Sequence, residues 1–95
     1  MPSQITGKVV AISPDGSLVT DISVDRLRGV PRDERVTVTC DEHETRGIYE
    51  PDHSEVPSTY LALSGTSGSL ELTIVGENAA RMLAIRVGES VVVAW

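Results

Sequence analysis

The densest group of side chains that can do chemistry is the segment CDEHE, residues 40–44. It holds a thiol, an imidazole and three carboxylates, and His53 beside Asp52 adds a second imidazole in the next predicted loop. A structural zinc site needs four ligands in a tetrahedral array, usually supplied as two spaced pairs. Here the Cys and the first His share one connector, and the thiol falls on the inward side of a predicted strand. The pattern therefore predicts a solvated acidic connector and no metal site.

The same residues offer a nucleophile and a base. Catalysis by Cys40 with His43 or His53 needs the thiol beside an imidazole and an oxyanion pocket nearby. The alternation of Val36, Val38 and Cys40 instead makes the thiol a small core residue. The chain also has no nucleophile-elbow pattern of the type G-x-S-x-G. We therefore expect no catalytic residue in these 95 residues.

A second candidate is SGTSG at residues 64–68, where Gly65 and Gly68 surround Thr66 and Ser67. Glycine lets a backbone approach a ligand closely, and exposed N–H groups in such a turn bind anions. The segment lacks the Lys and the following helix of a phosphate-binding loop, and the strand after it excludes a dinucleotide fingerprint. Its spacing alone favours a hairpin turn.

The elements that must position these residues are mostly strands. The chain has no Phe, and its many β-branched residues at alternating spacing favour extended structure. The alternation is clearest at 35–40 and 69–74, where apolar and polar residues take turns. We predict strands at residues 4–12, 18–22, 35–40, 46–50, 59–63, 69–74 and 89–95.

Loops and turns separate these strands. Asp15 and Gly16 are predicted to supply the positive backbone angles of a two-residue hairpin turn. Residues 24–34 are expected to form a loop with one helical turn. Residues 41–45 are expected to form a polar connector.

One helix is predicted, near residues 77–86. Asn78 is its expected N-cap, and Gly88 is expected to close the segment. Ala79, Met82 and Leu83 share one helical face and are assigned to the core. Six or seven short strands and one short helix predict a mainly β fold, a small closed or half-closed antiparallel barrel.

Composition limits the function. We expect residues 1–95 to form one domain. A formal net charge of −6 argues against a nucleic-acid partner, because phosphate binding needs a basic surface. Four of the eight Lys and Arg residues fall at 26–35 among acidic residues, which predicts a self-neutralising loop, with an anion or partner contact as the alternative.

The location of the protein is also limited. No apolar run is long enough to span a membrane and no secretory signal is visible, so we expect no membrane partner. Cys40 is the only cysteine, which is typical of the reducing cytoplasm.

Two segments together resemble a known family. GKVVAISPDGSLVTDI (7–22) is similar to the start of the C-terminal domain of the SAM hydroxide adenosyltransferases, relatives of the SAM-dependent fluorinases and chlorinases. That family typically shows G-x-V-x-x-I-D-x-F-G-N-x-x-T-N-I. YLALSGTSGSLELTIVGENAARMLAIRVGESVVV (60–93) is similar to the end of the same domain. The resemblance implies a small β-barrel that contacts the adenosine and amino-acid ends of SAM across a subunit boundary.

The resemblance also implies ligand contacts. It maps them onto Ser13, Ser17, Asp21, Thr66 and Ser67. Several of these differ from the family pattern: the Asp before the turn is Ser13, the two Asn are Ser17 and Asp21, and the Phe is Asp15. A change that removes one hydrogen bond to the ligand weakens binding by ~1–3 kcal/mol. SAM affinity is therefore expected to be poor.

Three functions follow. Enzymes of this family carry the catalytic Asp on a larger N-terminal domain, for which this chain has no room, so we expect a stand-alone, non-catalytic binding or assembly module. Its partner would be a second copy or another protein chain. The alternative is binding of SAM or adenosine, as a sensor or in complement to a separate catalytic chain. An enzyme using Cys40 or a carboxylate pair is the third.

Overall fold

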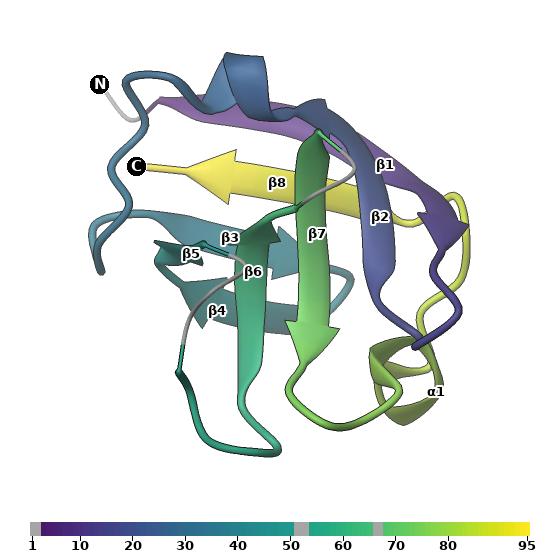
Figure 1. The fold of residues 1–95 in the computed structure, drawn as a ribbon. Helices are drawn as coiled ribbons and strands as arrows, with labels where there is room; N and C mark the ends of the chain where they lie inside the picture. Colours follow the sequence, from purple (N-terminus) through teal and green to yellow (C-terminus); the bar gives the residue numbers. More distant parts are fainter. Residues whose placement is uncertain (1–2, 51–53, 66–67) are drawn as a thin grey trace.

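The computed structural model describes residues 3–50, 54–65 and 68–95. They form one eight-stranded sheet in the order β4-β3-β8-β1-β2-β7-β6-β5, which rolls into a nearly closed barrel (Figure 1). The strands are β1 (Gln4–Ile12), β2 (Leu18–Ser23), β3 (Thr37–Cys40), β4 (His43–Arg46), β5 (Ile48–Tyr49), β6 (Tyr60–Ser64), β7 (Ser69–Ile74) and β8 (Ser90–Ala94). A 3₁₀ turn, η1 (Val24–Leu27), follows β2, and one helix, α1 (Ala79–Leu83), precedes β8. The predicted small β-barrel with one short helix is confirmed, with eight strands.

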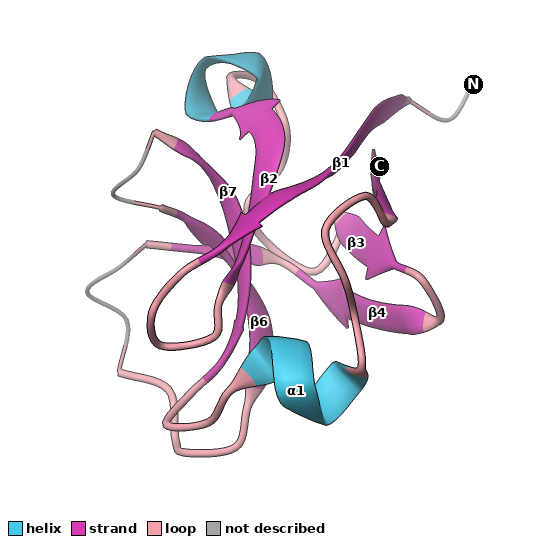
Figure 2. Ribbon diagram, turned by 90° about the vertical axis from the view of Figure 1, so that its right-hand side faces the viewer, coloured by secondary structure: helices cyan, strands magenta, loops and turns pink. Residues whose placement is uncertain are grey.

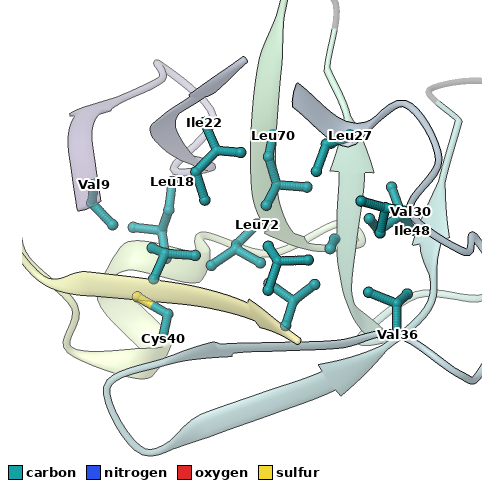
Figure 3. Close-up of a cluster of buried hydrophobic side chains, with 14 of the residues drawn as sticks. Val9, Leu18, Ile22, Leu27, Val30, Val36, Cys40, Ile48, Leu70 and Leu72 are labelled. Carbon is teal, nitrogen blue, oxygen red and sulfur yellow. The ribbon is translucent and has the colours of Figure 1, made fainter. Parts of the chain in front are cut away.

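Aliphatic side chains fill the inside of the barrel (Figure 3). The inward residues of β3 and β7 are the ones that the alternation predicted, and Val38, Cys40, Leu70 and Leu72 are fully buried. Leu18 and Ile22 of β2 face them. No helix of the described ranges is long and apolar enough to cross a membrane.

The connection between β1 and β2 is longer than predicted. Ile12 pairs with Leu18, so five residues form the loop, and only Gly16 among them has a positive φ, of 90°. The Gly16 N–H donates to the Ser13 carbonyl at 2.9 Å, which closes a β-turn with Pro14 at its second position. Proline favours that position of an ordinary turn, so the two-residue hairpin turn was a wrong prediction.

The segment predicted as a polar connector at 41–45 contains a strand. Cys40 pairs with His43, so Asp41 and Glu42 alone form the turn, and Asp41 adopts a φ of 56°. The chain then continues through β4 and Gly47 into β5, which pairs in parallel with β6. The sheet is therefore not antiparallel throughout.

The helix α1 is shorter than predicted. Asn78 caps it as expected, since its side-chain oxygen accepts from the Arg81 N–H at 2.9 Å. The helix ends at Ala84, which has a left-handed φ of 55°, and not at Gly88. Met82 is 59% exposed, so its assignment to the core was wrong. A five-residue helix does not sustain a full apolar stripe, and Ile85 beyond it occupies the buried position instead.

The loop between β2 and β3 neutralises itself, as its charge pattern predicted. Arg28 pairs with Asp25 at 3.1 Å and Arg35 with Asp33 at 2.9 Å. A third arginine of this loop, Arg32, lies 3.5 Å from Glu50. Because these arginines are paired, little free positive charge remains here for an anion. Because the pairs are exposed, they add little to the stability of the fold.

Candidate functional site

The loop between β1 and β2 holds a carboxylate in a fixed place. The Ser13 hydroxyl donates to Asp15, and the Ser17 N–H donates to the Ser13 oxygen at 3.0 Å and to the Asp15 oxygen at 3.3 Å. These bonds, that from Ser13 most of all, hold the pKa of Asp15 below its usual value of 3.8. Asp15 is therefore a preoriented negative charge at neutral pH.

The same loop is attached to the start of α1. The Ala80 N–H donates to the Gly16 carbonyl at 2.9 Å. A Cβ on Gly16 would lie 2.3 Å from the Asn78 side chain, so only glycine lets the loop approach the helix so closely. Figure 2 shows α1 at one end of the barrel, next to this loop.

A pocket of about 360 Å³ lies where the loop, the end of β7 and the turn before α1 meet. Its lining residues are Asp15, Thr73, Ile74, Gly76, Glu77 and Asn78. Carboxylate, hydroxyl and amide groups predominate, and none of these lining residues is Lys or Arg. The pocket therefore suits a ligand that carries hydrogen-bond donors or positive charge.

Ser17, a predicted ligand contact, serves the barrel. It is only 4% exposed, and its hydroxyl donates to the Thr73 hydroxyl at 2.9 Å. This bond joins the start of β2 to β7. The donor that the resemblance assigned to a ligand is thus used inside the protein.

Asp21 and its neighbour Thr20 hold an irregular stretch of β2. The pairing of β2 with β7 shifts register between Val19 and Ser23. Thr20, fully buried, fills the irregularity: its hydroxyl donates to the Leu70 carbonyl at 2.7 Å and accepts from the Ile22 N–H at 3.2 Å. On the other side of the strand, the Asp21 carboxylate accepts from the Lys8 N–H at 2.9 Å. Exposed Asp21 thus has a structural partner and does not line the pocket.

Thr66 and Ser67, the other two predicted contacts, lie outside the described residues. Next to them, the Glu71 side chain lies over Gly65, and a Cβ at that glycine would be 2.1 Å from its carboxylate.

Of the candidate metal and nucleophile residues, Cys40 and His43 lie opposite each other in the β3–β4 pair, and His53 lies outside the described residues. Cys40 is fully buried, as predicted, and burial raises its pKa from 9.0 to about 11. His43 Nε2 lies 3.2 Å from the Leu83 carbonyl. Within the described ranges, no three His, Cys, Asp or Glu residues come close enough to hold a metal ion.

The structure thus brings together a different set from the predicted one. Of the predicted contacts, Ser13 belongs to the loop at the pocket and orients Asp15. Glu77 and Asn78 were missed as pocket residues, because Asn78 was assigned only as the helix N-cap and Glu77 was given no role. Both residues lie within the segment 60–93 on which the resemblance rests, and that segment could have directed attention to them.

Solved structures share this fold. An uncharacterized conserved protein from Thermotoga maritima matches with a TM-score of 0.78 and 20% identity, over 95% of this chain and 35% of that chain. A conserved hypothetical protein from Thermus thermophilus matches with a TM-score of 0.68 and 16% identity, over 93% of this chain and 32% of that one. The chain therefore spans about a third of the length of these two proteins.

Comparison with families is more specific. No curated protein matches the chain. A family model described as the SAM hydroxide adenosyltransferase C-terminal domain matches residues 7–92, from the middle of β1 to the middle of β8. The chain therefore belongs to the family of SAM hydroxide adenosyltransferase C-terminal domains.

Proposed function

We propose that these residues form a non-catalytic binding and assembly module that docks on another protein chain, in the cytoplasm. The observation that carries the proposal is the internal use of the expected ligand groups. The Ser17 hydroxyl is engaged by Thr73, and the Asp21 carboxylate by the Lys8 backbone. A side chain already satisfied within the barrel gains little from a ligand.

The surroundings of Cys40 and His43 support the same proposal. The thiol of Cys40 lies in the core, where its raised pKa keeps it protonated and unreactive. The Nε2 atom of His43 lies 3.2 Å from the Leu83 carbonyl and is engaged there. Nothing here favours acyl or group transfer by these residues.

Exposed apolar side chains on and beside β1 support docking. Val10 and Ile12 on β1 are 44% and 42% exposed, and Val87 is 57% exposed. Val87 lies beside β1, because the Gly88 N–H donates to the Val9 carbonyl at 2.7 Å. Two copies of this chain, each with a net charge of −6, approach one another against repulsion, which favours a different chain as the partner.

Variants of this surface test the docking. We expect the wild-type protein, immobilised, to retain a partner from lysate of its source that Val10→Lys and Val87→Lys lose. Val56→Lys is the matched control, because Val56 is 68% exposed on a different loop. Light scattering over a range of concentrations reports whether a second copy takes the place of that partner. Docking at this surface is refuted if light scattering shows only a monomer and the wild type and the three variants all retain the same proteins.

The pocket favours a second function, binding of SAM or adenosine. Asp15 and Glu77 line it without an ion-pair partner in the described chain, and SAM carries a sulfonium and an ammonium group. The loop that supplies Asp15 is also the stretch that resembles the SAM-contacting part of the family. Calorimetry with SAM, adenosine and methionine tests this function, with Asp15→Asn expected to weaken SAM more than adenosine. No heat at millimolar ligand would rule it out.

A further inference from the structure

The barrel wall has one boundary without backbone pairing. Successive strands from β4 round to β5 are joined by ladders of hydrogen bonds, but no ladder joins β4 to β6, which are both fully described. We call the boundary between β4 and Tyr60 the seam. Side chains alone span it: the Thr45 hydroxyl donates to the Tyr60 carbonyl at 3.1 Å, and the rings of His43 and Tyr60 meet edge to face, 6.5 Å apart.

A third contact holds the end of the seam near the helix. His43 Nε2 lies 3.2 Å from the carbonyl of Leu83, the last residue of α1. Opening the seam therefore breaks a few side-chain contacts and leaves every strand ladder intact. Such local openings need less free energy than global unfolding.

The interior next to the seam gives a reason for it to open. Among the described residues, the Tyr60 hydroxyl is the one buried side-chain polar atom with no hydrogen-bond partner. Keeping a buried hydroxyl unpaired is costly, and contact with water removes the cost. Cys40 is also fully buried and sits opposite His43 in the β3–β4 pair.

We propose that the barrel opens at the seam while the rest of the fold stays intact. β4 moves away from β6, and solvent reaches the Tyr60 hydroxyl and the Cys40 thiol. The seam is thus a gate in the barrel wall, and Cys40 is a natural probe of it. This proposal is independent of the pocket and of the docking surface.

Reaction of Cys40 with the thiol reagent DTNB at increasing urea concentration tests the gate. At low urea, the rate should be nearly independent of urea, because opening exposes little surface. At higher urea the rate should join the global unfolding rate. Thr45→Val, which removes only the seam hydroxyl, should raise the low-urea rate by about fivefold.

Two further variants make the experiment specific. Thr73→Val is the matched control, because it also removes a threonine hydroxyl. That hydroxyl accepts from Ser17 on a part of the wall away from the seam. This variant should leave the low-urea rate unchanged. Tyr60→Phe should lower this rate, because opening no longer hydrates a hydroxyl. A rate that follows global unfolding at every urea concentration would overturn the proposal, and so would an equal response to the two threonine variants. If Thr45→Val does not fold, the urea dependence of the wild-type rate decides alone.

Discussion

Replacing Thr20 with Val tests how β2 is held in place. The Thr20 side chain is fully buried, and its hydroxyl serves two backbone groups that the irregular pairing leaves without a ladder partner, the Leu70 carbonyl and the Ile22 N–H. Valine has nearly the same shape, so the change isolates the hydroxyl. Each backbone group left unpaired in the core costs ~1–3 kcal/mol. The extra apolar group returns about 1 kcal/mol, so we expect the free energy of unfolding to fall by about 1–5 kcal/mol.

Equilibrium urea unfolding, followed by the fluorescence of Trp95 and by circular dichroism, measures this loss. Thr20→Ser keeps the hydroxyl and loses one methyl group, so it should cost only about 1 kcal/mol. Thr6→Val is the control on an exposed part of β1 and should stay within about 0.5 kcal/mol of the wild type. Burial of apolar surface alone predicts that Thr20→Val stabilises the protein. A Thr20→Val variant as stable as the wild type, or more so, would therefore refute the role of the hydroxyl.

Three further changes should alter stability. Tyr60→Phe removes the buried hydroxyl that has no partner, so urea unfolding should show a gain of about 1 kcal/mol, and a loss would reveal a missing partner. Gly16→Ala places a Cβ against Asn78 at a φ of 90°, so it should cost about 2 kcal/mol or more, and an unchanged Tm would contradict this. Burial raises the pKa of Cys40 from 9.0 to about 11, so the folded protein keeps a proton that the unfolded chain releases. The free energy of unfolding should keep this contribution in full below pH 9 and lose up to about 3 kcal/mol as the pH rises from 9 to 11. Urea unfolding repeated across this pH range measures the loss. Cys40→Ala should flatten this alkaline loss, and equal slopes for the two proteins would count against it.

The barrel was predictable because strands such as β3 and β7 alternate strictly. Val38 and Leu72 sit in runs where every second residue is apolar, and burial of one face then fixes which side points inward. The strand β4 was not predictable by the same rule. Its residues are polar, and half-buried His43 and Thr45 are placed by contacts across the seam that lie far away in sequence.

The candidate site was predictable only in part. The resemblance directed attention to the right loop, and Ser13 does belong to it. The roles of Ser17 and Asp21 depend on how β2 meets its neighbours, and an irregular register leaves no mark on the alternation of residues. The loop and the helix beside the pocket are joined by the bond between Gly16 and Ala80, which are distant in sequence, so no local pattern predicts it.

The first and last described residues form a hydrogen-bonded pair, because Ser3 and Trp95 exchange N–H to carbonyl bonds of 2.9 Å in both directions. In Figure 1 both chain ends lie on the side of the barrel away from α1. Affinity tags or fluorophores fused at either end thus emerge from the same edge, remote from the pocket, and leave calorimetry there unobstructed. A short peptide bridging the two ends would give a cyclic protein, which could then be reopened at the Asp41–Glu42 turn as a circular permutant.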